Sequence, residues 1–299
     1  MFYFCKMQGT GNDFVIVDYI TEKFEYSFKL LSEFLCNRHY GVGADGVIII
    51  DKSEIADFKM RIFNSDGSEA EMCGNGIRCF AKYVYEHGFI KKERFDIETM
   101  AGIKNVELSI EGKTVVNIKV EIGEPVFELE KIPVIYDNLV EDYTENISDK
   151  TQENDTLNAV VMKDKNCIRI YEKEFYAICL GNPHVVCFVE DVDNTNVKEI
   201  GKKVENSKYF LNKTNVEFVQ IINENEIKVR VWERGVGETL SCGTGACAAA
   251  IVSHLQKSTN CDINVDLRGG NLKVKYDKES NKVYLEGEAK EVFSGSLII

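Results

Sequence analysis

The sequence predicts an α+β fold built from two copies of one unit, and three observations lead to this prediction. Much of the 299-residue chain alternates apolar and polar side chains with a period of two, which is typical of half-buried strands. Only a few segments carry apolar residues at helical spacing. A group of motifs in the first half also recurs, in the same order, in the second half. Many short strands and few helices favour antiparallel sheets.

The individual elements follow from these periods. The strand pattern is clearest in Val115–Ile122, Ile227–Trp232 and Leu272–Tyr276. Helices are predicted over roughly Ser27–Arg38, Gly76–His87 and Gly245–Gln256. Gly88 follows the second of them and is expected to cap its C-terminal end.

The internal repeat aligns a strand, a loop, a Cys-Gly-x-Gly motif and a helix start. Cys73 matches Cys242 at an offset of 169 (242 − 73). The same offset pairs Glu69 with Glu238, Gly74 with Gly243, Gly76 with Gly245, and Met60–Asn64 with Val229–Glu233, while Gly11–Val15 matches Gly181–Val185 at 170 (181 − 11). We therefore expect two similar halves, each of which contributes one cysteine at a helix start. The repeated Glu69 and Glu238 could be catalytic carboxylates, but we favour a structural role in which each braces the loop before its cysteine.

Composition excludes several classes of function. The chain has 36 Lys and Arg against 49 Asp and Glu, a net charge of −13, and no basic block, so nucleic-acid binding is not expected. The longest apolar run, Ala246–Val252, is far shorter than the ~20 residues of a membrane helix. The first residues carry no signal-peptide pattern. We therefore expect a cytoplasmic protein that binds neither nucleic acid nor membrane. The polar segment 138–158 is expected to be a solvated insertion or loop in the second copy.

The ten cysteines are too dilute for a disulfide scaffold, and none forms a Cys-x-x-Cys pair. The spacing therefore predicts no metal site, and most of these thiols are expected to be buried hydrophobic residues. Cys73 and Cys242 need another explanation, because packing alone gives no reason to repeat the polar loop around them.

Each of these two cysteines precedes a glycine-rich helix start, which binds anions through unpaired N–H groups and the positive end of the helix dipole. Neither motif has the Lys-Ser/Thr of a phosphate-binding loop, and a carboxylate fits two converging helix starts at least as well as a phosphate. Helix N-termini also lower thiol pKa values, so one or both thiols could ionise near neutral pH.

Two facing thiols around one carboxylate suit a specific reaction. One thiolate removes a proton from the carbon next to the carboxylate, and the opposite thiol returns a proton to the other face. The configuration inverts, the helix starts stabilise the enolate-like charge, and the rate should depend on pH with a bell shape.

At these residues the sequence closely resembles the diaminopimelate epimerase family. The matching segments are Met7–Phe14, Arg38–Gly43, Asn64–Arg78, Gly181–His184, Thr214–Val216 and Trp232–Cys247. The resemblance implies a cofactor-independent epimerase of lysine and peptidoglycan precursor synthesis that acts as a homodimer on a small amino acid. It also implies two pseudo-symmetric domains, each a curled antiparallel sheet or barrel around a central helix, with the active site in the cleft between them. Because the family's last strand returns to the first domain, we expect domains of 1–123 plus 287–299, carrying Cys73, and of 124–286, carrying Cys242.

The resemblance also implies roles for individual residues. Cys73 would take the proton from LL-diaminopimelate, and Cys242 would reprotonate the carbon to give the meso form. Backbone amides would hold the reacting carboxylate, at Gly74, Asn75, Gly243 and Thr244. Glu233 would pair with the reacting amine, and His184 would lie beside the substrate as a positioning residue. The distal amino-carboxylate would be fixed by Asn12, Asn64, Asn182, Asn215 and Arg234.

Several alternatives stay open from sequence. The same chemistry would serve a racemase for histidine or proline, or an epimerase for lanthionine. The distal set argues for a substrate with amino-acid groups at both ends, which both diaminopimelate and lanthionine have. A Cys/His hydrolase using His184 would leave one cysteine without a role, and a non-catalytic amino-acid-binding module would leave both without one. Gly46 stands where many relatives have Gln, so we assign no contact there.

Overall fold

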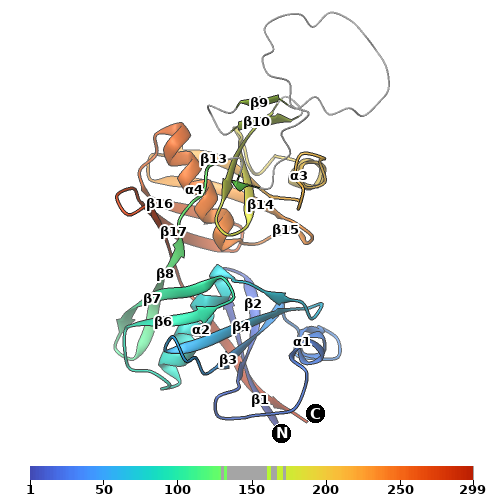
Figure 1. Ribbon diagram of the computed structural model, residues 1–299, viewed down its shortest axis with the longest axis vertical. Coiled ribbons are helices and arrows are strands. Elements are labelled where there is room, and N and C mark those ends of the chain that lie inside the picture. The colour runs from blue at the N-terminus through green and yellow to red at the C-terminus, as the bar shows by residue number, and fades with distance from the viewer. Residues whose placement is uncertain (129–130, 133–159, 163–166, 171–172, 299) are drawn as a thin grey trace, which may run out of the picture.

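The computed structural model describes residues 1–128, 131–132, 160–162, 167–170 and 173–298. The described residues form two lobes stacked along the long axis of the molecule, and both termini lie at the free end of the lower lobe (Figure 1). The predicted polar segment 138–158 falls outside the described residues.

The lower lobe contains β1 (Phe2–Gly9), β2 (Asn12–Asp18), α1 (Phe28–Cys36), β3 (Gly46–Asp51), β4 (Phe58–Asn64), β5 (Glu69–Ala70), α2 (Gly74–Glu86), β6 (Arg94–Thr99), β7 (Gly102–Glu111) and β8 (Thr114–Gly123). The upper lobe contains β9 (Val160–Met162), β10 (Cys167–Ile170), β11 (Lys173–Cys179), β12 (Pro183–Phe188), α3 (Val197–Glu205), β13 (Asn215–Asn223), β14 (Glu226–Glu233), β15 (Gly237–Thr239), α4 (Gly243–Lys257), β16 (Asp262–Leu267), β17 (Gly270–Asp277) and β18 (Lys282–Gly287). The last strand, β19 (Lys290–Leu297), pairs with β1 in the lower lobe.

The two lobes repeat one topology, as the sequence repeat predicts. In the lower lobe β2 pairs with β3 and β4 pairs with β6. In the upper lobe β12 pairs with β13 and β14 pairs with β16 in the same way. The α+β fold with two pseudo-symmetric halves is therefore confirmed.

The prediction of antiparallel sheets is wrong for these four pairs, which are parallel. A parallel neighbour cannot be reached through a hairpin and needs a crossover, usually a helix. Each of the four helices lies between two such strands in the chain: α1 between β2 and β3, α2 between β4 and β6, α3 between β12 and β13, and α4 between β14 and β16. Alternation along single strands could not reveal these pairings.

One helix in each lobe is buried among the strands (Figure 1). In α2, Ile77, Phe80 and Val84 are fully buried, and in α4 the run Ala246–Ile251 is buried throughout. A helix that is apolar all round belongs in a core, and its alanines let surrounding strands approach closely. This burial fixes the positions of the helix starts.

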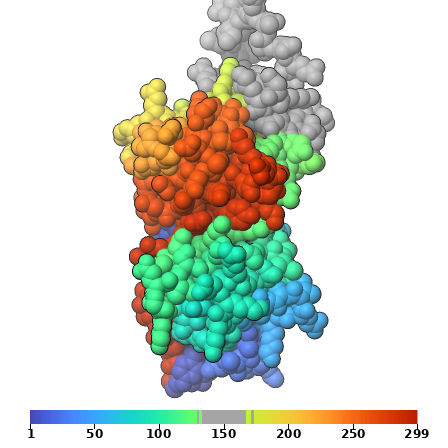
Figure 2. Space-filling view, turned by 90° about the vertical axis from the view of Figure 1, so that its left-hand side faces the viewer, coloured from blue at the N-terminus to red at the C-terminus, as the bar shows by residue number. Residues whose placement is uncertain are grey.

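A strand pairing joins the two lobes. Strand β8 of the lower lobe pairs antiparallel with β18 of the upper lobe, with Val120 opposite Leu285. The chain then returns to the lower lobe, where β19 pairs with β1 and Cys5 lies opposite Ser294. In the space-filling view the lobes remain distinct masses, and the chain's last residues lie along the flank of the lower one (Figure 2).

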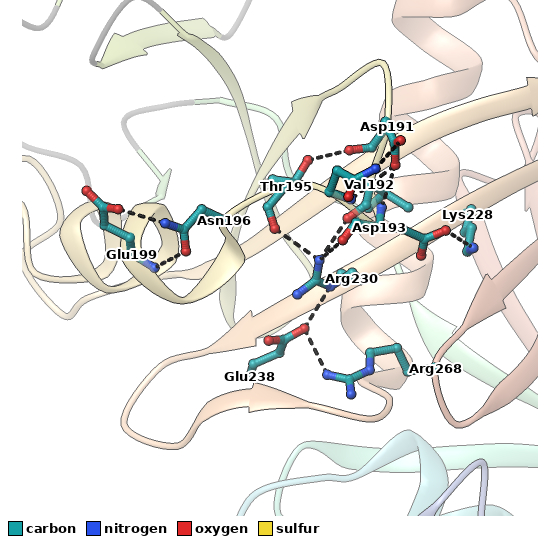
Figure 3. Close-up of polar contacts among 11 residues, drawn as sticks. Asp191, Val192, Asp193, Thr195, Asn196, Glu199, Lys228, Arg230, Glu238 and Arg268 are labelled. Carbon is teal, nitrogen blue, oxygen red and sulfur yellow. Dashed lines mark hydrogen bonds and ion pairs between the residues drawn. The ribbon is translucent and has the colours of Figure 1, made fainter.

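The two repeated glutamates brace their loops, which supports the structural role that we favoured. Arg61 donates two hydrogen bonds to Glu69, of 2.7 Å from Nε and 2.8 Å from Nη2. In the upper lobe Arg230 Nε donates to Glu238 Oε1 over 2.8 Å, and Arg268 donates to the same oxygen (Figure 3). Arg230 Nη1 also donates to the carbonyls of Val192, Asp193 and Thr195 ahead of α3. Arg61 and Arg230 are themselves 169 residues apart (230 − 61), so the brace belongs to the repeated unit.

Gly201, inside α3, packs directly against Trp232 of β14, and its replacement tests how tightly the helix packs on this strand. A Cβ there would lie 2.5 Å from Trp232 Cγ, and the indole is held by a 2.8 Å hydrogen bond to Glu205. We expect Gly201→Ala to destabilise the protein by roughly 1–3 kcal/mol, because overpacking outweighs the helix propensity of alanine. Denaturant unfolding measures the change. Lys202→Ala, at an exposed position of the same helix, is the control and should stay within about 0.5 kcal/mol of the parent. A Gly201→Ala variant as stable as the parent would contradict this packing.

Candidate active site

Each of the two repeated cysteines is the N-cap of a central helix. Cys73 has extended φ and ψ of −140° and 119°, and its sulfur accepts a hydrogen bond from the N–H of Gly76 over 3.4 Å. Cys242 has nearly the same backbone conformation, and its sulfur accepts from Gly245 over 3.4 Å. The helices thus start at Gly74 and Gly243, two residues before the predicted positions. The thiols thus accept the capping hydrogen bond that a serine or aspartate side chain usually accepts at this position.

The starts of α2 and α4 meet at two glycines. A Cβ on Gly74 would lie 3.4 Å from the Cα of Gly243, and a Cβ on Gly243 would lie 3.2 Å from the Cα of Gly74. Leu285 of β18 closes the same contact, within 3.1 Å of either added Cβ. Asn75 Nδ2 crosses between the lobes and donates to the carbonyl and hydroxyl oxygens of Ser241, both at 3.4 Å. The two cysteine-capped helix starts are therefore adjacent.

Around Cys73 the structure brings together two of the predicted asparagines. The thiol donates to Asn12 Oδ1 over 3.7 Å, and Asn75 Nδ2 donates to the same oxygen over 3.4 Å. Asn12 is held in turn by Asp45, which accepts from its Nδ2 over 2.8 Å.

Around Cys242 the predicted residues form a chain of hydrogen bonds. The Cys242 sulfur lies 3.5 Å from Thr244 Oγ1, which accepts from Asn182 Nδ2 over 3.4 Å. Asn182 Oδ1 lies 2.9 Å from His184 Nε2, and His184 Nδ1 lies 2.7 Å from Glu217 Oε1. His184 and Glu217 are fully buried.

The remaining predicted residues lie at strand ends. Asn215, at the start of β13, accepts from the backbone N–H of Arg234, whose own side chain is exposed and donates to the carbonyl of Asn212. Glu233, at the end of β14, accepts a 2.5 Å hydrogen bond from Thr239. Asn64 ends the equivalent strand β4, is exposed, and its amide donates to Ser68 in its own turn, so among the described residues the structure does not join it to the other predicted residues.

The thiol pKa values do not follow the simple expectation from helix N-termini. Burial raises the pKa of Cys73, and the N–H groups of Gly76 and Asn75 lower it by less. Burial raises the pKa of Cys242 well above its ordinary value, and the carboxylates of Glu233 and Glu217 raise it further. The expected net lowering is therefore wrong, because loss of water around the sulfurs outweighs the helix starts. Glu233 raises the pKa of both thiols, and burial raises the pKa of Glu233 itself.

Sequence reasoning missed three residues that the structure places here: Ser241, Glu217 and Arg78. Glu217 left a signal, because it is a lone carboxylate in the apolar run Val216–Val219. Arg78 lies inside the matching segment Asn64–Arg78 but received no role.

Comparisons with solved structures define the fold class of this protein. Solved structures that share this fold include a phenazine biosynthesis protein of the PhzF family from Bacillus anthracis, with a TM-score of 0.65, 18% identity, and coverage of 100% of this chain and 99% of that one. A probable proline racemase from Agrobacterium radiobacter K84 has a TM-score of 0.67 and 11% identity, with coverage of 100% and 93%. The fold is thus the two-lobed fold of these proteins.

The family is shown by sequence. The profile of the diaminopimelate epimerase family matches residues 4–128 and 176–292. A diaminopimelate epimerase from Caldanaerobacter subterraneus is 44% identical over 296 residues, 99% of each chain, and one from Methanococcus maripaludis strain C6 is 43% identical at the same coverage. The chain belongs to the diaminopimelate epimerase family, and it is an isomerase. Among the described residues, no helix has both the length and the apolar character to cross a membrane.

The glycine contact between the lobes generates a test. In Gly243→Ala the new Cβ would lie 3.1 Å from Leu285 Cδ2 and 3.2 Å from Gly74 Cα, which is closer than ordinary contact, so the neighbouring atoms must shift. We expect turnover to fall by roughly tenfold, since a displacement on the order of 1 Å costs about 10²-fold in a positioned site and this shift is smaller. Epimerisation rate and melting temperature are measured together. Gln256→Ala, at the exposed far end of α4, is the control, and a fully active Gly243→Ala enzyme would contradict the requirement for contact.

Proposed function

We propose that this isomerase interconverts LL-diaminopimelate and meso-diaminopimelate by proton transfer at the α-carbon between Cys73 and Cys242, in lysine and peptidoglycan precursor synthesis. The observation that carries the proposal is the meeting of two cysteine-capped helix starts at Gly74 and Gly243, in a chain of this family.

The helix starts provide a site for the reacting carboxylate. The first-turn N–H groups of Gly74, Asn75, Gly243 and Thr244 lie at the positive ends of two helices that abut. A carboxylate between them is stabilised by both dipoles, and so is the additional charge that forms on it when the α-proton leaves. The absence of side chains at the two glycines lets the ligand approach the backbone closely.

The proton transfer is balanced by the two sulfurs. The Cys73 thiolate takes the α-proton of the LL isomer and becomes a thiol. The Cys242 thiol gives its proton to the opposite face of the carbanion and becomes a thiolate. The product has inverted configuration, and no other group is oxidised or reduced. In the reverse direction Cys242 is the base and Cys73 is the acid.

Glu233 connects substrate binding to thiol ionisation. Its carboxylate raises the pKa of both thiols. An α-ammonium group paired with Glu233 cancels that negative charge, so the bound substrate itself favours the thiolate that reacts with it. The acidic limb of the pH profile should therefore lie lower for the enzyme–substrate complex than for the free enzyme.

The distal amino-carboxylate is proposed to contact Asn12, Asn64, Asn182, Asn215 and Arg234. The exposed Arg234 guanidinium can take a carboxylate in bidentate fashion. His184 is proposed to be a positioning residue, which is supported by its hydrogen bond to Asn182 and its complete burial. The two ring nitrogens of His184 contact Glu217 and Asn182, and among the described residues neither contacts a cysteine, which counts against a Cys/His hydrolase.

We further propose the division into domains of 1–123 plus 287–299 and of 124–286. The return of β19 to β1 supports the discontinuous first domain. A cytoplasmic homodimer is proposed from the family alone.

Replacement of either cysteine tests the mechanism. We expect Cys73→Ala and Cys242→Ala each to lower epimerisation by roughly 10²–10⁴-fold, because each removes one acid or base. The measurement is deuterium uptake from heavy water into the α-position, followed by mass spectrometry. Cys261→Ala, at an exposed cysteine away from the helix starts, is the matched control and should keep full turnover. Near-normal turnover in either test variant would refute the two-thiol pair.

A substrate panel tests the assignment of diaminopimelate. We expect LL-diaminopimelate to exchange its α-hydrogen faster than LL-lanthionine, L-histidine and L-proline, because only the first two have amino-acid groups at both ends and the similarity to diaminopimelate epimerases favours the first. Initial deuterium-exchange rates are compared at equal concentration. Faster exchange with any of the other three would overturn the assignment while leaving the two-thiol chemistry intact.

A further inference from the structure

The two thiols accept the same backbone hydrogen bond but have unlike surroundings. Each sulfur accepts from the N–H three residues further on, over 3.4 Å in both halves. The sulfurs differ in the side-chain atom that each contacts directly, Asn12 Oδ1 for Cys73 and Thr244 Oγ1 for Cys242, and in the charged side chains behind each helix start. The repeat allows those side chains to be compared position by position.

On the Cys73 side, the distinctive residue is Arg78, one turn further along α2. Its side chain is fully buried, and its guanidinium donates to Gly74 O at 2.9 Å, Asn75 Oδ1 at 3.0 Å, Thr10 Oγ1 at 2.6 Å and Glu288 O at 3.3 Å. All four acceptors are neutral, and within the described ranges no carboxylate lies at ion-pair distance from it. Arginine keeps its proton even when buried. Cys73 therefore lies near a positive charge that no carboxylate pairs with among the described residues, and this charge offsets part of the rise in thiol pKa that burial causes.

The equivalent position in the upper lobe holds no charge. At the offset of 169, Arg78 corresponds to Cys247 (247 − 78), which is fully buried in α4. The cation is thus present behind one thiol and missing behind the other.

On the Cys242 side, the distinctive residue is Glu217 of β13. A Cβ on Gly245 would lie 2.8 Å from Glu217 Oε1 and 3.4 Å from the Cys242 sulfur, so carboxylate and thiol flank the same glycine. The second carboxylate oxygen, Oε2, is buried and has no hydrogen-bond partner among the described residues. His184 compensates part of the charge through its 2.7 Å contact with Oε1.

The equivalent positions in the lower lobe are apolar. Strand register matches Phe14 to His184 and Gly46 to Asn215, which places Ile48 where the upper lobe has Glu217. A Cβ on Gly76 would accordingly meet Ile48 Cδ1, at 3.1 Å. The repeat therefore differs by a cation behind Cys73 and by a carboxylate and histidine behind Cys242.

We propose that Arg78 and Glu217 are positioning residues that make the two thiols unequal before substrate binds, with Arg78 favouring the thiolate at Cys73 and Glu217 keeping Cys242 protonated. The inference rests on the proposed two-thiol function. Of the other charged groups near the thiols, Glu233 acts on both sulfurs and does not distinguish them in sign, and Asp45 acts on Glu233.

This asymmetry matters for repeated turnover. After LL to meso conversion the proton resides on Cys73 and the negative charge on Cys242, beside Glu217. That arrangement is the less favourable one, so exchange of protons with solvent returns the enzyme to the Cys73 thiolate. The enzyme is then ready for another LL molecule.

Alkylation in the absence of substrate tests the proposal. The intact protein is pulsed with iodoacetamide between pH 6 and 10.5, and modification of Cys73 and Cys242 is quantified separately by peptide mass spectrometry. The pH dependence is compared and not the absolute rate, because access to a thiol scales the rate equally at every pH. We expect the alkylation midpoint of Cys73 to lie at least about one pH unit below that of Cys242, which is tenfold in thiolate at a fixed lower pH.

Three variants assign the effect. Arg78→Met should raise the Cys73 midpoint by about one pH unit, or slow its alkylation about tenfold at fixed pH, while Arg78→Lys should keep it near the parent value. Glu217→Gln should lower the Cys242 midpoint and leave that of Cys73 in place. Equal midpoints in the parent enzyme, or variants that shift both thiols alike, would overturn the proposal.

Two controls show whether misfolding of a variant, or a wrong assignment of the substrate, could account for the alkylation result. Circular dichroism reports whether each variant folds. If Arg78→Met does not fold, Arg78→Lys and the near-isosteric Glu217→Gln still carry the test, and a Glu217→Gln enzyme with an unchanged Cys242 midpoint refutes it. Because no substrate is present, the outcome does not depend on diaminopimelate. Unequal midpoints in an enzyme that does not exchange deuterium would instead refute the proposed function.

Discussion

The contact between Gly74 and Gly243 brings the first turns of the two central helices together and so organises the site. The two helix starts abut at backbone distance because their first residues are glycines, and a Cβ added to either one would lie 3.2–3.4 Å from the Cα of the other. Two partial positive charges are thereby held together, an arrangement that is unfavourable until an anion occupies it. Because Cys73 precedes Gly74 and Cys242 precedes Gly243, the same contact also brings the two capping cysteines, one from each lobe, close to the same site.

The rigidity of that contact comes from the core of each lobe. Because α2 and α4 are crossovers between parallel strands, each is enclosed by its own sheet and cannot slide without unpacking it. The β8–β18 pairing joins the lobes, and the chain returns from β18 to the lower lobe through β19, which pairs with β1. The Arg61–Glu69 and Arg230–Glu238 pairs hold the loops that lead into the cysteines. The symmetry of the scaffold thus places the two thiols at equivalent positions of the repeat.

Burial of the two thiols makes it harder for either of them to ionise. Cys242 is buried and Cys73 is half-buried, and the loss of water around the sulfurs strengthens charge interactions but raises the pKa of both thiols above the ordinary value. The helix N–H groups oppose this only in part. The substrate's own ammonium at Glu233, and the buried charges of Arg78 and Glu217, are the means by which a thiolate can form without exposing the site to water. The scaffold is symmetric, but these charges are not, and the difference in charge makes the two thiols ionise unequally.

The sequence by itself determined the repeat, the two Cys-Gly-x-Gly helix starts, the strands around them and the family, because each of these is written in local spacing and residue order. The three predicted helices were right to within two residues, the offset at α2 and α4 arising because a cysteine N-cap has no strong sequence signal, and α3 was not predicted. The parallel pairings, the contact of Gly74 with Gly243 and the chain from Glu217 through His184 to Cys242 join residues that are far apart along the chain. The net direction of the thiol pKa values also needed the tertiary structure, because desolvation depends on every atom that replaces water around a group, and no motif records that.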